Sequence, residues 1–184
     1  MTLFRKKDRG FTLVEMLIAV SIIAIMASVV IVSVGKSRAR GRDARRISDL
    51  KQIQQALVFY YDSGNTTAGV KGFPSTGGAW YSSESGDSVP NGLANNGEWV
   101  PGLAPNYIDA LPKNPGGGKI NDSVNCGSGV KPSYRYKFDG VSYKLLAYCS
   151  PEGVMSDTNS SFYDPVRTSW AWMVCAGNTA CTTW

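Results

Sequence analysis

The chain has 184 residues, 43% of them hydrophobic and 18% charged, with a formal net charge of +5. It contains no histidine, so a serine or cysteine nucleophile lacks its usual base. No serine motif, phosphate-cradling glycine loop or paired-carboxylate signature stands out either, and we therefore expect no enzyme. The positive charge is uneven: residues 1–10 carry four Lys and Arg against one acid, residues 36–51 seven against two, and residues 52–184 eight against ten.

The first predicted element is a membrane-spanning helix. Nineteen residues, Met16 to Val34, form an apolar run, and its only polar members are Ser21, Ser28 and Ser33. A helix of roughly 20 apolar residues crosses the hydrocarbon core of a bilayer. Glu15 directly precedes this run, and a carboxylate near lipid is costly unless it is paired or reaches the interface.

A cation for Glu15 would arise if the chain were cut after Gly10. The new amine on Phe11 would have a pKa of roughly 7.7–8.0 and would be mostly charged at neutral pH. In helices that stack with an axial offset, the amine of one could meet the carboxylate of the next. The alternative is that Glu15 reaches water at the membrane surface and that the helix is a plain anchor.

Residues 6–10 (KKDRG) and 11–20 (FTLVEMLIAV) resemble the class III signal of the type IV pilin and pseudopilin family. In that family a membrane aspartic peptidase cleaves after the glycine, the new N-terminal residue is N-methylated, and the glutamate fifth in the mature chain guides subunit docking. The resemblance assigns cleavage to Gly10 and Phe11, N-methylation to Phe11 and subunit docking to Glu15.

A secretory signal peptide is the competing interpretation, because Ser33-Val34-Gly35 is a passable cleavage site for one. The apolar cores of such peptides are about 7 to 15 residues long, and the run here is longer. We therefore expect the apolar segment to remain in the mature chain.

A second helical pattern follows the apolar run. Hydrophobic residues recur at three- and four-residue steps, which predicts an amphipathic helix with one buried stripe: Ile47, Leu50, Ile53, Leu57 and Tyr60 or Tyr61. Gly64-Asn65 is a suitable stop, so one helix is predicted over residues 11–63. The expected organisation is a leader at 1–10, a membrane and filament-core helix at 11–34, an amphipathic helix at 35–63 and a β-rich head at 64–184.

A basic cluster lies between the two helical patterns, formed by Lys36, Arg38, Arg40, Arg42, Arg45, Arg46 and Lys51. Such a cluster could bind anionic lipid headgroups, acidic patches of neighbouring subunits or DNA phosphates. A solvated stripe on a helix that leaves the bilayer is the plainer interpretation.

The head is expected to contain a short antiparallel sheet. Tyr134, Tyr136 and Phe138 alternate with basic residues, and residues 139–140 (DG) give a two-residue turn signal. We expect the partners to be Val141 for Phe138, Tyr143 for Tyr136 and Leu145 for Tyr134, with all six on one face. Residues 170–175 could add a third strand. The predicted fold class is α+β, with a long N-terminal helix packed on a small antiparallel sheet, and the resemblance implies a pilin-like fold.

A second resemblance concerns residues 107–116 (YIDALPKNPG) followed by residues 134–136 (YRY), which are similar to the segment that links helix and hairpin in major pseudopilins of type II secretion and related pilins. The chain departs from those proteins at residues 114–117 (NPGG), which lack their acid and indole. Their C-terminal calcium loop has no convincing counterpart, because Asp157, Asn159 and Asp164 show no recognisable order. We expect neither a metal nor a cofactor.

All four cysteines lie in the head: Cys126, Cys149, Cys175 and Cys181. An even number in an exported domain suggests two disulfides, and three connectivities are possible. We favour pairing Cys126 with Cys149 and Cys175 with Cys181. Zinc is the rival, but the chain has neither histidine nor a C-x-x-C element.

The expected function is that of a structural subunit of a type IV pilus, made as a precursor in the cytoplasmic membrane and polymerised into an extracellular filament. A pseudopilin of a type II secretion system is the alternative within the family. The resemblance implies as partners other pilin subunits, the prepilin peptidase and methylase, and an inner-membrane assembly platform. A tip or minor pilin that binds DNA or a host surface is the alternative of another class, using the basic cluster or Trp170, Trp172 and Trp184.

Overall fold

The structure is a computed structural model, and it describes residues 10–67, 70–84, 98–116, 131–152, 158–168 and 170–184. Most of the leader, Cys126 and Asp157 lie outside these residues. The chain forms two compact units, Met1–Arg38 and Ala39–Trp184. Each unit is described by itself below.

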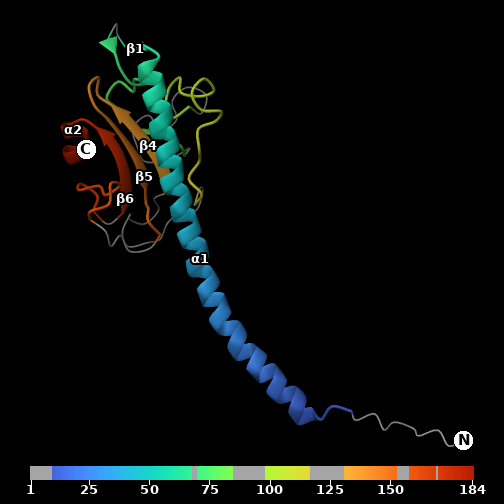
Figure 1. Cartoon of the computed structure of the whole chain (residues 1–184). Helices are drawn as coiled ribbons and strands as arrows, with labels where there is room; N and C mark the ends of the chain where they lie inside the picture. Colours follow the sequence, from blue (N-terminus) through green and yellow to red (C-terminus); the bar gives the residue numbers. More distant parts are fainter. Residues whose placement is uncertain (1–9, 68–69, 85–97, 117–130, 153–157, 169) are drawn as a thin grey trace, which may run out of the picture. The chain divides into compact units, whose positions relative to one another are not determined.

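The predicted α+β class is confirmed. One long helix, α1 (Leu13–Asp62), is followed by short strands and a last short helix, α2 (Asn178–Thr183). A four-stranded antiparallel sheet has the order β3-β4-β5-β6, and a small separate hairpin joins β1 to β2 (Figure 1). The strands are β1 (Thr66–Thr67), β2 (Val70–Lys71), β3 (Tyr81–Ser82), β4 (Ser133–Phe138), β5 (Tyr143–Tyr148) and β6 (Ala171–Ala176).

The first unit contains the apolar half of α1. By length and composition, α1 is long and apolar enough to cross a membrane. Its described large apolar side chains up to Val34 are exposed, from 41% of the surface at Val34 to 80% at Leu13. None of the residues that the structure describes in this unit buries these side chains, and an apolar surface of this kind is unfavourable in water.

The second unit has its core between α1 and the sheet. Leu50, Ile53 and Leu57 are fully buried, as the helical periodicity predicts, and they join one apolar cluster with side chains from β4, β5 and β6. Tyr60 continues this stripe and packs edge-on against Tyr107, with ring centroids 5.3 Å apart. Gly64, at φ 76°, follows the end of the helix in the left-handed region that glycine tolerates.

The hairpin of β4 and β5 has a different register from the predicted one. The observed partners are Tyr143 for Phe138, Leu145 for Tyr136 and Ala147 for Tyr134. The connection is four residues long, because the carboxylate of Asp139 accepts hydrogen bonds from two backbone N–H groups inside the loop. A shift of two residues keeps the same side chains on the core face.

The rest of the sheet agrees only partly with the sequence-based predictions. Val141 lies in the loop and is 86% exposed, so its predicted place on the core face is wrong. The third strand predicted at residues 170–175 is confirmed as β6, beside β5. On the opposite edge, β3 pairs with β4, which the sequence pattern did not predict. Helix α2 lies on the side of the sheet away from α1 (Figure 1).

Candidate functional site

The start of α1 is built by reciprocal hydrogen bonds between Thr12 and Glu15. The backbone N–H and the hydroxyl of Thr12 donate to Oε2 of Glu15, at 2.9 and 2.8 Å. The backbone N–H of Glu15 donates in return to Oγ1 of Thr12, at 3.2 Å. This arrangement is a capping box, which satisfies N–H groups that the first turn of a helix leaves without partners.

The capping box gives Glu15 a role that the sequence reasoning missed. A carboxylate is favourable at a helix N-terminus, because the aligned peptide dipoles leave partial positive charge there. Thr12 was not recognised, although a Thr followed three residues later by Glu is the usual sequence signature of this motif. Gly10 and Phe11 precede the cap and are exposed, and Phe11 keeps 78% of its surface. The cleavage, methylation and docking roles of these residues remain predictions.

Two cations of the basic cluster are held by acids of the head. Both oxygens of Glu152, in the loop after β5, accept hydrogen bonds from Arg42, one of them from Nε at 2.7 Å. The guanidinium of Arg46 is fully buried, 2.6 Å from Oδ1 of Asp43 and 2.8 Å from Oε1 of Glu152. The main-chain N–H of Glu152 also donates to the Asp43 carboxylate. These contacts attach the loop after β5 to α1.

Asn114 completes the surroundings of Arg46. Its side-chain oxygen accepts hydrogen bonds from Nε of Arg46 at 3.1 Å and from the backbone N–H of Gly116 at 3.0 Å. The hydrogen bond from Arg42, together with Arg46, lowers the pKa of Glu152 against the opposing effect of its partial burial.

The other cations of the cluster are more accessible. Lys36, Arg38 and Arg40 are exposed, and none of them forms an ion pair within the part of the chain that the structure describes. Nε of Arg45 lies 4.0 Å from the Asp49 carboxylate, one helical turn away. The basic cluster is therefore divided into a membrane-proximal exposed part and a part that stabilises the head.

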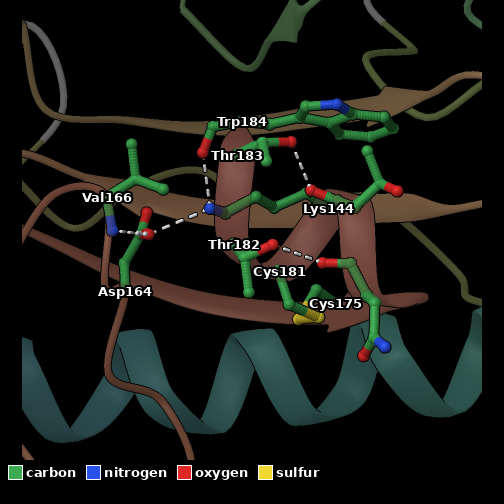
Figure 2. The surroundings of a disulfide bond; sticks show 10 residues. Lys144, Asp164, Val166, Cys175, Cys181, Thr182, Thr183 and Trp184 are labelled. Carbon is green, nitrogen blue, oxygen red and sulfur yellow. Dashed lines mark hydrogen bonds and ion pairs between the residues drawn. A yellow bond between two sulfur atoms is a disulfide. The ribbon is translucent and has the colours of Figure 1, made fainter.

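A second buried ion pair lies on the side of the sheet away from α1. Nζ of Lys144, on β5, donates to Oδ1 of Asp164 at 2.9 Å and to the main-chain oxygen of Trp184 at 2.6 Å (Figure 2). Both side chains of the pair are fully buried. Burial lowers the pKa of Lys144, while the hydrogen bond to Asp164 acts in the opposite direction. Arg167 also contacts the Asp164 carboxylate, at 3.2 Å.

A disulfide joins Cys175 on β6 to Cys181 on α2, with 5.5 Å between the Cα atoms, in the pairing that the sequence favoured (Figure 2). Cys149 is also disulfide-bonded, and its favoured partner Cys126 lies outside the described residues. Of the tryptophans expected at a binding surface, Trp172 is only 9% exposed and belongs to the core, so that expectation is wrong for Trp172. Among the described residues, no group of three Cys, Asp or Glu side chains is arranged to hold a metal ion.

Comparison with known proteins gives one match. Residues 5–31 match the family model described as the prokaryotic N-terminal methylation motif. The matched segment contains Gly10, Phe11 and Glu15, the capping box and most of the apolar half of α1. No curated protein and no solved structure matches the chain.

Proposed function

We propose that this chain, which carries the class III prepilin signal of type IV pilins and pseudopilins, is the structural subunit of a type IV pilus. The precursor is held in the cytoplasmic membrane by the apolar half of α1. A prepilin peptidase removes the leader after Gly10, and Phe11 becomes the methylated N-terminal residue. Subunits are then extracted by an inner-membrane assembly platform and polymerise through this half of α1 into an extracellular filament.

The observation that carries the proposal is the exposed apolar surface of α1 with a carboxylate at its front. The large apolar side chains from Leu13 to Ile31 are exposed in the part of the chain that the structure describes, and exposure of such a surface to water is unfavourable. Lipid covers this surface in the precursor, and neighbouring copies of α1 cover it in the filament. Glu15 then supports axial register, because a carboxylate removed from water needs a positive partner such as the amine of an adjoining Phe11.

A pilus is favoured over a type II secretion pseudopilus by the head. A disulfide fixes α2 to the edge strand β6, and two buried ion pairs reinforce the head. Reinforcement of this kind suits a protein exposed outside the cell. Filaments on the cell surface, recovered and identified by mass spectrometry, would support the pilus. A loss of protein secretion without surface filaments, on deletion of the gene, would instead support the pseudopilin.

The docking role of Glu15 is testable separately from its capping role. Glutamine also completes a capping box, so Glu15→Gln keeps the helix start and removes the charge. Thr12→Ala keeps the charge and removes the cap. If the carboxylate acts in docking, Glu15→Gln should be cleaved normally but yield no filaments, whereas Thr12→Ala should still assemble.

The measurements are filament yield by electron microscopy and the mass of the mature N-terminus. Gly10→Ala is the processing control, since it should leave the leader attached. Normal filament yield from Glu15→Gln would contradict the docking role. Loss of filaments from Thr12→Ala alone would indicate that assembly needs the capping box and not the charge of Glu15.

A further inference from the structure

The sheet face away from α1 carries tryptophans and a tyrosine in contact with cations. We call it the cation–aromatic face, and it contains Trp80, Lys137, Tyr148, Arg167, Trp170 and Trp184, all of them half-buried. These residues come from segments far apart in the chain: Lys137 and Tyr148 lie on the paired strands β4 and β5, Trp80 precedes β3, Arg167 and Trp170 precede β6, and Trp184 follows α2. The assembly of this face is therefore a property of the fold.

One end of the cation–aromatic face is organised around Lys137. Its ammonium lies 4.4 Å from the ring centroid of Trp184 and 5.8 Å from that of Trp80. Trp184 is held in place because its main-chain oxygen accepts hydrogen bonds from Lys144 and Arg167, both at 2.6 Å. The attraction between a cation and an aromatic ring orients Lys137 without removing its hydrogen-bond donors.

At the other end of the cation–aromatic face, cations and aromatic rings again alternate. The guanidinium carbon of Arg167 lies 5.4 Å from the ring centroid of Trp80 and 5.8 Å from that of Trp170. Trp170 packs edge-on against Tyr148 at 4.8 Å, and the guanidinium of Arg135 lies 3.3 Å from the centroid of Tyr148. The rings and cations thus form a continuous series along the sheet.

Positive charge exceeds negative charge in this series. Within the described part of the chain, the carboxylate of Asp164 contacts Arg167 of this series, and it also pairs with the buried Lys144. The basic cluster on α1 is a poorer candidate for a single strand, because among the described residues its cation–aromatic contact is the single one between Lys51 and Phe162.

We propose that the cation–aromatic face binds single-stranded nucleic acid. Proteins that bind such strands without sequence preference combine cations that follow the backbone with aromatic rings that contact the bases. Lys137 supplies a contact for a phosphate, and Trp80, Trp170 and Trp184 supply apolar ring surface. A duplex, whose bases are stacked internally, would use the cations but not the rings. The proposal goes beyond filament formation and does not depend on it.

The test uses the full chain in a neutral detergent and a fluorescein-labelled 15-nucleotide oligo-dT, followed by fluorescence anisotropy. Binding should weaken as salt rises. Each phosphate contact on a single strand contributes about 0.7 to the slope of log affinity against log salt. Lys137→Gln should lower this slope by about 0.7 and weaken binding about fivefold at 0.1 M salt. Trp80→Ala should weaken binding at least fivefold through lost ring contact.

Lys71→Gln is the matched control, because Lys71 lies 4.4 Å over the ring of Tyr61, outside the cation–aromatic face, and its replacement removes the same charge. It should bind like the wild type. Circular dichroism establishes that each variant is folded, and Trp80→Phe should retain most of the affinity lost in Trp80→Ala. Equal losses in Lys71→Gln and Lys137→Gln would overturn the proposal, as would no binding at low salt. Stronger binding of heparin or of duplex DNA, insensitive to Trp80→Ala, would also overturn it.

Discussion

At the scale of single residues, the head depends on two buried cations. Arg46 and Lys144 have fully buried side chains; Arg46 is paired with Asp43 on the same helix and with the distant Glu152, and Lys144 is paired with Asp164. A buried charge is costly without its partner, so removing one member of such a pair destabilises more than the same change at the surface. Substitutions at Asp164 and Glu152 should therefore have larger effects than substitutions at exposed acids.

The first prediction concerns Glu152. Glu152→Gln removes the charge that pairs with Arg42 and Arg46, and it should lower the free energy of unfolding of the head by about 2 kcal/mol at pH 7. Urea denaturation of the full chain in detergent, followed by tryptophan fluorescence, measures this loss. The exposed Asp109→Asn serves as the control and should leave the midpoint unchanged.

The same pair predicts a pH dependence. The pKa of Glu152 is lowered below the ordinary value of a glutamate, chiefly by the hydrogen bond from Arg42. A carboxyl group with a depressed pKa stabilises the folded state above its unfolded pKa, and this stabilisation is lost as the pH falls through the folded pKa. The difference in unfolding free energy between wild type and Glu152→Gln should therefore be constant above pH 4.5 and shrink below it. A difference that grows on acidification would contradict the assigned ion pairs.

At the scale of elements, the position of α2 depends on the close approach of Gly177 to the β4–β5 loop. Gly177 has φ 93°, and a Cβ atom there would lie 2.1 Å from Oγ and 2.8 Å from Cβ of Ser142. A side chain at this position would be strained and would also collide with the loop. The disulfide of α2 restricts how far the helix can move away.

Gly177→Ala should thus destabilise the head by more than the cost of the backbone conformation alone, about 3 kcal/mol against about 1 kcal/mol. Gly140→Ala isolates the backbone cost, because Gly140 has φ 105° and open space around its Cα. Adding Ser142→Gly to Gly177→Ala should restore part of the loss. Thermal unfolding compares the three variants, and equal losses in Gly140→Ala and Gly177→Ala would show that the approach to Ser142 is unimportant.

Elements with a periodic pattern could be predicted from the sequence. The stripe on α1 and the alternation in β4 and β5 indicate which face is buried, and both predictions are confirmed except for Val141. The hairpin register could not be read from alternation, because a shift of two residues leaves the pattern unchanged. The side chain of Asp139 decides between the two loops, and its hydrogen bonds form only in the folded loop.

Contacts between segments that are distant in the chain have no comparable pattern in the sequence. The pairing of Arg46 with Glu152 and of Lys144 with Asp164 depends on where irregular loops return to the fold, and such loops have no period. The capping box is different, because Thr12 and Glu15 are three residues apart and their spacing was visible in the sequence. The same Glu15 belongs both to the motif that predicts docking and to the capping box that starts the helix.

At the scale of the whole molecule, the two units bury apolar surface in different ways. The core of Ala39–Trp184 is complete within that unit, whereas the apolar side chains of Met1–Arg38 that the structure describes are exposed. The second unit should therefore fold without the first. We predict that a fragment of residues 39–184 is a soluble monomer without detergent, with an intact disulfide between Cys175 and Cys181.

Size-exclusion chromatography with light scattering and non-reducing mass spectrometry test this prediction. The full chain serves as the comparison and should aggregate when detergent is withdrawn, because its apolar segment is then exposed to water. Aggregation of the fragment alone would indicate that residues before Ala39 contribute to the core of the head.

The capping box also fixes the first helical residue at Leu13, so the peptide bond after Gly10 lies in non-helical chain. Peptidases grip their substrates as extended strands, and a coiled backbone would have to be unwound before it could enter such a cleft. Thr12 and Glu15 keep the first turn of α1 closed, while the bond at which we propose cleavage stays outside the helix. The proposed cleavage would therefore leave the start of the helix undisturbed.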